Sequence, residues 1–258
     1  MAVFMRVIRN VGYTRQQKSR AKWLTISGFL LFALGFVLVG VLDNVMYSYA
    51  TLIPAYVLFI AGMQQLGKWT NSARRPRGDI LLDESLKHLP DRYTLIHYAK
   101  VGNVVLEHVL LHPGGALLIV MRDVVGKIEL KRKRFRRMAN PIARMIGASG
   151  PPLGQPDREL DEGVAAVERM LKERQSEIDV SGVVLFTSPD HHLEEIDPEI
   201  DSIDVRDLAD YVRVLEPDPS FKQQERDQIA SALSSGDGFE RSGPVRTRRP
   251  VVVKRRAA

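Results

Sequence analysis

"GNVVLEHVLLHPGGALLIVMRD", residues 102–123, contains two apolar runs on either side of Pro113-Gly114-Gly115. Short apolar runs bounded by turn residues are typical of buried strands. The stretch therefore predicts a hairpin in a sheet that is covered on both faces. One carboxylate, Glu107, lies inside the first strand, where a charge is costly unless it has a partner. The second strand ends with Val120 and Arg122 and brings no acid to meet it.

The composition excludes several kinds of site and shows an uneven charge distribution. The chain has 258 residues and no cysteine, which rules out disulfides, thiolate zinc sites and cysteine nucleophiles. Its net charge of +6 divides into +5 over residues 1–67, +8 over 68–137, −14 over 138–240 and +7 over 241–258. Charge blocks of this kind indicate separate surfaces with separate partners.

Two long uncharged runs lie near the N-terminus, at residues 23–42 and 45–66. A bilayer core needs about 20 apolar residues in a helix, so the runs predict a transmembrane helical hairpin over 23–66. The alternatives are a buried core helix or a signal peptide, whose apolar region is only about 7–15 residues long. Lys and Arg flank the pair on both outer sides and are absent from the connection, so we expect both termini in the cytoplasm.

The expected organisation is α/β, with two transmembrane helices followed by a cytoplasmic restriction-endonuclease-like α/β sandwich domain at the cell membrane. Its segments are a basic cytoplasmic N-terminus (1–22), the hairpin (23–66), a basic linker (67–77), an α/β domain (78–233) and a basic disordered tail (234–258). Within the domain, the pattern predicts a helix, a strand meander, an amphipathic helix that starts near Asp157 and a further buried strand.

The order of these elements and several motifs resemble the NERD (nuclease-related) domain of the PD-(D/E)xK, restriction-endonuclease-like superfamily. The similarity starts at Gly78-Asp79, where the family has Gly-Glu opening a helix, and continues in "LEHVLLHPGGALLIV", residues 106–120. It covers roughly residues 74–215. The resemblance implies a divalent-metal-dependent nuclease site, in which two carboxylates hold Mg²⁺ against the scissile phosphate.

This sequence departs from the family at the positions that carry the family's metal-binding and catalytic residues. Val120 stands at the position of the second-strand acid and Arg122 at that of the lysine, while Asp79 and Glu107 keep carboxylates. Valine binds no cation, and arginine with a pKa above about 12 is no general base. The expected catalytic set is therefore a vestigial Asp79, Glu107 and Arg122, with Asp79 and Glu107 as the only candidate metal ligands. No cofactor is expected, or Mg²⁺ if the site is active.

A salt bridge between Glu107 and Arg122 is the alternative to metal binding, because neighbouring strands of a hairpin bring such rows together. Three histidine positions have structural explanations. His108 is expected to be a hydrogen-bonded core residue, His112 a turn residue, and His191-His192 part of an exposed loop.

The segment "KRKRFRR", residues 131–137, is strongly basic. It is either a solvated edge strand, since cations protect open sheet edges, or a surface that binds phosphates of nucleic acid or anionic lipid. The candidate anion-binding residues are Lys131, Arg132, Lys133, Arg134, Arg136 and Arg137.

Three functions remain open from the sequence. The first is a catalytically degenerate binding or scaffolding module that contacts nucleic acid or anionic lipid through the basic strand. The second is a nuclease that uses Asp79 and Glu107, with Arg122 holding the phosphate. The third is a structural membrane protein that binds another protein through its acidic helix, which begins near Asp157.

Overall fold

The computed structural model describes residues 5–42, 46, 50, 53–57, 60, 78–138, 153–236 and 238–242, without the side chains of 21, 32, 35, 36, 38–42 and 242. The chain divides into two compact units. One contains Met1–Arg9, Asp79–Ser235 and Arg241–Ala258, and the other contains Asn10–Gly78 and Gly236–Glu240.

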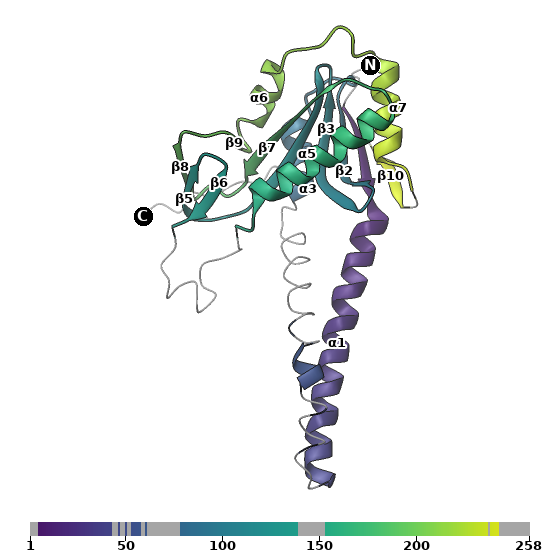
Figure 1. Cartoon of the computed structure of the whole chain (residues 1–258), viewed down its shortest axis with the longest axis vertical. Helices are drawn as coiled ribbons and strands as arrows, with labels where there is room; N and C mark the ends of the chain where they lie inside the picture. Colours follow the sequence, from purple (N-terminus) through teal and green to yellow (C-terminus); the bar gives the residue numbers. More distant parts are fainter. Residues whose placement is uncertain are drawn as a thin grey trace. The chain divides into compact units, whose positions relative to one another are not determined.

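The described residues form a mixed main sheet of seven strands in the order β10-β1-β2-β3-β4-β7-β9 (Figure 1). Its strands are β1 (Arg6–Asn10), β2 (Thr94–Val101), β3 (Val104–His112), β4 (Gly115–Arg122), β7 (Asp179–Phe186), β9 (Asp201–Asp204) and β10 (Phe239–Ser242). Strand β3 is antiparallel to both β2 and β4, whereas β7 runs parallel to β4 and β9 parallel to β7. The α/β class is therefore confirmed.

The predicted hairpin is present, and its turn requires glycine. His112 pairs with Gly115, so Pro113-Gly114 is the two-residue connection between β3 and β4. Gly115 has φ +155°, and a Cβ at this position would lie 2.2 Å from the carbonyl oxygen of Asp179. No other residue fits there without moving β7 away from β4. His112, predicted in the turn, is instead the buried last residue of β3.

Helices cover the two faces of the sheet. Leucines of α3 (Gly78–Leu86) pack in one apolar cluster with Leu95 of β2, Leu110 of β3 and Leu117 of β4. Helix α5 (Pro156–Glu173) packs on the other face, where a Cβ at Gly163 would lie 2.8 Å from the side chain of Leu118. Leu117 and Leu118 point to opposite sides of β4, so α3 and α5 enclose the sheet between them.

The remaining described elements extend this core. A second sheet has the order β6-β5-β8, formed by β5 (Gly126–Lys131), β6 (Arg134–Arg137) and β8 (His191–Ile196). Helices α6 (Leu208–Val214) and α7 (Gln223–Leu233) follow β9. His191-His192, predicted in an exposed loop, begin β8.

Both ends of the chain contribute strands that the sequence analysis did not predict. β1 falls within the predicted N-terminal segment 1–22 and pairs in parallel with β2, with Arg6 opposite Thr94. β10 falls within the segment predicted as a disordered tail. Each is only four or five residues long, which is too short for a clear alternation of polar and apolar residues.

The predicted transmembrane hairpin is not supported. Helix α1 (Val11–Leu42) contains the first predicted span, and its described apolar side chains include Trp23 and Leu30, which are 68% and 66% exposed. In the part of the chain that the structure describes, however, no helix is long and apolar enough to cross a membrane.

The fold class is therefore corrected to a mixed α/β fold in which the two predicted transmembrane helices are not supported, while location at the cell membrane stays a prediction. The second predicted span, 45–66, and the linker, 67–77, lie almost entirely outside the described residues. The cytoplasmic orientation of the termini was inferred from the two spans and stays a prediction.

Candidate functional site

Glu107 lies where β3 and β4 separate. The ladder between these strands runs from the turn to the pair His108 and Ile119, and Glu107 is the next residue of β3. The backbone N–H of Met121 in β4 donates to Oε2 of Glu107 at 3.0 Å. The carboxylate therefore takes the place of a strand partner and satisfies an amide that the ladder leaves open. This contact gives the acid inside the strand a structural role.

Arg122 is held on every side by groups of its own chain. Its Nη1 lies 3.6 Å from Oε2 of Glu107, and its Nη2 lies 2.7 Å from Oε1 of Glu159 in α5. Nε donates to the carbonyl oxygen of Leu153 at 2.8 Å, and Nη1 donates to that of Met121 at 2.7 Å. Only 10% of the side chain is exposed. All three guanidinium nitrogens are thus engaged in internal contacts, and the expected proximity of Glu107 and Arg122 is observed.

The environment of Glu107 favours its neutral form more than water does. Burial among surrounding protein atoms raises the pKa of Glu107, even though 37% of its side-chain surface still reaches solvent. The charge of Arg122 and the Met121 amide lower this pKa, and Glu159 raises it. The net rise shows that one neighbouring guanidinium does not fully offset the desolvation of the carboxylate.

Asp79 does not join Glu107. It is buried in the first turn of α3, and its Oδ2 lies 3.4 Å from Nη1 of Arg9 in β1. The described partners of Glu107 come instead from β4 and α5, on the side of the sheet away from the leucines of α3. The two predicted metal ligands therefore contact separate cations.

The described residues do not fit the magnesium ion that the resemblance implies. Val120 is a buried apolar residue. Oε2 of Glu107 faces the guanidinium of Arg122 and the Met121 amide. Within the described ranges there is no group of three or more His, Asp or Glu placed to hold a metal ion.

A buried polar network lies beneath α3. Nε2 of His97 is 2.9 Å from Oδ1 of Asp83, and Nδ1 of His97 is 2.7 Å from Nδ1 of His108. Because a carboxylate only accepts, the Nε2 of His97 carries the hydrogen. Arg9 forms an ion pair with Asp83 as well as with Asp79. His108 is thus a hydrogen-bonded core residue, as predicted, and burial together with the charges of His97 and Arg9 holds its pKa well below the usual value.

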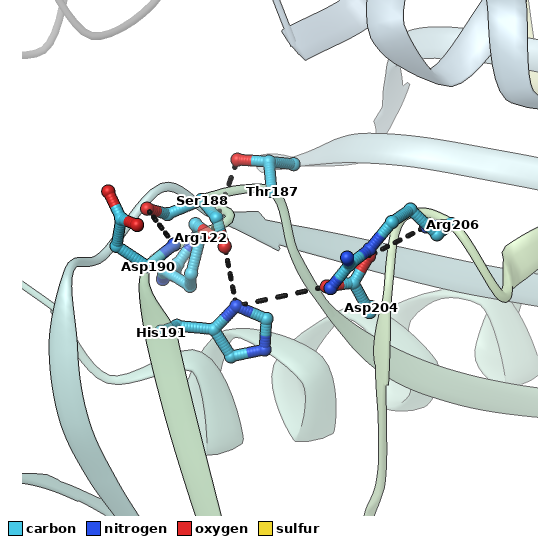
Figure 2. Close-up of polar contacts among 7 residues, drawn as sticks. All are labelled: Arg122, Thr187, Ser188, Asp190, His191, Asp204 and Arg206. Carbon is cyan, nitrogen blue, oxygen red and sulfur yellow. Dashed lines mark hydrogen bonds and ion pairs between the residues drawn. The ribbon is translucent and has the colours of Figure 1, made fainter. Parts of the chain in front are cut away.

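A second polar cluster, which the sequence analysis did not predict, lies at the carboxyl ends of β4, β7 and β9 (Figure 2). Arg122 accepts hydrogen bonds through its carbonyl oxygen from the N–H of Thr187, at 3.0 Å, and from its hydroxyl, at 3.5 Å. Nδ1 of His191 donates to the carbonyl oxygen of Ser188 at 2.5 Å and lies 3.9 Å from Oδ2 of Asp204.

Arg206 completes this cluster with two hydrogen bonds to Asp204, at 2.8 and 2.7 Å, and these bonds lower the pKa of Asp204. His191 also stacks on Phe186, with ring centroids 5.1 Å apart. Carboxyl ends of parallel strands often carry ligand sites, but the contacts here join groups of the chain to one another. The cluster connects β8 of the second sheet to the carboxyl ends of β4, β7 and β9 in the main sheet.

The predicted basic strand forms the β5–β6 hairpin, and β6 is an edge of the second sheet. Phe135 of β6 points inward, where its ring lies 6.0 Å from that of Phe186. Five cations on this hairpin are exposed: Lys131, Arg132, Lys133, Arg134 and Arg136. Arg137, which was predicted with them, is half-buried and donates to the carbonyl oxygen of Val125 at 2.6 Å. None of the five exposed cations forms an ion pair with another described residue.

The Arg122 contacts make it the most sensitive position of this region. We expect Arg122→Lys to lower the free energy of unfolding by about 3 kcal/mol, because one ammonium cannot replace the contacts to Glu107, Glu159 and Leu153, and a buried pair is broken. Urea unfolding of the full chain measures the loss. Arg206→Lys, at a guanidinium that is 73% exposed, is the matched control and should change stability much less; equal losses would contradict the internal role of Arg122.

The buried histidine pair predicts a loss of stability in acid. His108 has a pKa far below 6.5 in the fold but near 6.5 when unfolded, so below pH 6.5 the unfolded chain binds a proton that the folded chain does not. Stability should fall by up to about 1.4 kcal/mol per pH unit from this residue. His112, whose pKa burial lowers to about 4, adds to the fall in the same range.

Urea midpoints at pH 7.0 and 5.5 test the pH effect. His108→Leu should flatten the pH dependence, whereas His88→Gln, at an exposed histidine, should leave it unchanged. Parallel pH curves for the wild type and His108→Leu would show that the pKa of His108 is the same in the folded and unfolded chain, which contradicts the prediction.

Comparison with known proteins identifies no relative: no family model, curated protein or solved structure matches the chain.

Proposed function

We propose that the α/β domain is a non-catalytic binding module that contacts the phosphate backbone of nucleic acid through the β5–β6 hairpin. The observation that carries the proposal is the set of five exposed cations on that hairpin, defined above, which have no acidic partner among the described residues. A cation that a protein leaves unpaired in solvent is available to replace the counterions of a phosphate.

The hairpin presents its charges in a geometry suited to a polyanion. Arg134 and Arg136 alternate with inward-facing Phe135 and so lie on one side of β6. Lys131 pairs with Arg134 across the hairpin, and Arg132 and Lys133 form the connecting turn. In the same sheet, Lys127 of the central strand β5 is paired with Glu194 of β8 at 2.6 Å, so the cations without an acidic partner among the described residues lie on β6, the turn and the adjoining end of β5.

The proposal excludes catalysis because the residues of the predicted catalytic site contact groups of the same chain. Arg122 uses its guanidinium to hold Glu107, Glu159 and Leu153, so none of its donors is directed at a substrate. The helix, strand meander, helix and strand (α3, β2 to β4, α5 and β7) follow the order on which the resemblance to NERD domains rests. Membership of that family remains a proposal, because no family model matches.

Binding of a labelled DNA duplex at several salt concentrations tests the proposal. We compare the full-length chain with Arg132→Gln/Lys133→Gln/Arg134→Gln/Arg136→Gln. Each phosphate contact contributes about 0.9 to the slope of log K against log salt. Removal of four cations should therefore lower the magnitude of that slope by about 3.6 and weaken binding at least about tenfold at low salt.

The control removes the same charge elsewhere, at four exposed cations of α5 and α6: Arg158→Gln/Arg169→Gln/Lys172→Gln/Arg213→Gln. It should retain most of the binding and the wild-type slope. Equal weakening by both sets would mean that only net charge matters, and binding to anionic vesicles without binding to DNA would assign the hairpin to lipid headgroups. Either result contradicts the proposal.

Incubation with plasmid DNA and Mg²⁺ or Mn²⁺ tests the non-catalytic part. We expect no cleavage above that of Glu107→Ala. Cleavage that disappears in Glu107→Ala would replace the proposal with the nuclease function that the resemblance implies.

A further inference from the structure

A groove with an apolar floor and an acidic rim lies between α5, the β7–β9 side of the main sheet and the β5–β6 turn. Its volume is about 370 Å³, within the range of small ligand sites. The residues that line it are Lys133, Leu160, Asp161, Val164, Ala165, Glu168, Gly182, Glu199, Ile200 and Asp201. We call this feature the α5 groove.

Two apolar residues lie at the floor of the groove. Leu160 and Ile200 are buried beneath it, at 5% and 8% exposure. Gly182 lets Leu160 pack directly on β7, because a Cβ at Gly182 would lie 2.7 Å from the side chain of Leu160. Apolar surface of this kind favours contact with an apolar segment.

The rim supplies negative charge at both ends. Asp161 and Glu168 are two turns apart on α5, about 10 Å along the helix, and Glu199 is on the loop before β9. All three are exposed, and none of them forms an ion pair with another described residue. Asp201 accepts a hydrogen bond from the hydroxyl of Tyr211 at 2.6 Å. Lys133 is the one cation that lines the groove in the described part of the chain.

We propose that the α5 groove binds the basic C-terminal segment of the same chain, residues 243–258. This segment has the complementary pattern: the apolar Pro250-Val251-Val252-Val253 lies between Arg248-Arg249 and Lys254-Arg255-Arg256. Valines would contact the floor, while the flanking cations meet the carboxylates at the two ends. Arg249 and Lys254 are about 16 Å apart in an extended chain, which spans the rim.

The segment is long enough to reach the groove. It follows β10, and β10 and β9 are the opposite edges of the main sheet. Six spacings of about 4.8 Å separate these edges, or about 29 Å in all. The valines are nine to eleven residues beyond Ser242, so an extended chain carries them about 30 to 36 Å from β10, which is enough to span this width without unfolding of β10.

The natural lack of cysteine makes a crosslinking test specific. In the full-length chain we introduce Ala165→Cys in the groove together with Val252→Cys, and we oxidise at low protein concentration. The control pair is Lys100→Cys with Val252→Cys, because Lys100 is exposed on β2 and does not line the groove. Docking raises the effective concentration of one thiol at the other, so the groove pair should form an intrachain disulfide at least about tenfold faster than the control pair.

Variants that remove the acidic charges of the rim distinguish docking of the segment from random collisions between the two thiols. Asp161→Asn/Glu168→Gln/Glu199→Gln, added to the groove pair, should slow the reaction several-fold, and so should 0.5 M salt, because screening shortens the reach of the charges. Far-UV circular dichroism and urea midpoints establish that the variants are folded. Equal rates for the two pairs, no effect of the charge changes, or a disulfide that forms mainly between chains would overturn the proposal.

Discussion

The guanidinium of Arg122 connects more of the domain than any other described side chain of the predicted site. It joins β4, which carries it, to β3 through Glu107, to α5 through Glu159, and to the segment before α5 through Leu153. A buried charge is stable only when its hydrogen-bonding capacity is filled. The position of α5 over the sheet is therefore tied to the charge at the end of β4, and the carboxylates on either side of Arg122 complement that charge.

These contacts explain why Glu107, Val120 and Arg122 are compatible with one another. Glu107 closes the end of the β3–β4 ladder and faces a guanidinium, while Val120 extends the apolar surface of β4. A second acid beside Glu107 would meet a carboxylate whose pKa burial already raises, and like charges at short range disfavour each other. Glu107, Val120 and Arg122 thus suit a structural role, because the polar groups contact one another and the valine packs as an apolar residue.

The sequence predicts the local elements well and the long-range arrangement less well. The glycine turn and the apolar runs of β3 and β4 identify the hairpin, because a strand of eight or nine residues carries its own periodic signal. β1, β8 and β10 were missed, since each is short or polar and forms only because a partner strand is present. Asp79 was expected to meet Glu107, but Arg9 of the unpredicted β1 binds it instead. The transmembrane hairpin was inferred from the run of uncharged residues, and the described helices do not support it.

The pairing of β1 with β2 has a consequence for the order in which the chain is made. Arg6 lies opposite Thr94, so the first strand leaves the ribosome long before its partner exists. At about 5–20 residues per second the wait is about 4 to 18 s. During that interval the apolar side chains of β1, Val7 and Ile8, which are buried in the finished fold, are exposed without a sheet to cover them. Nascent-chain binding factors would be able to bind this strand during that interval.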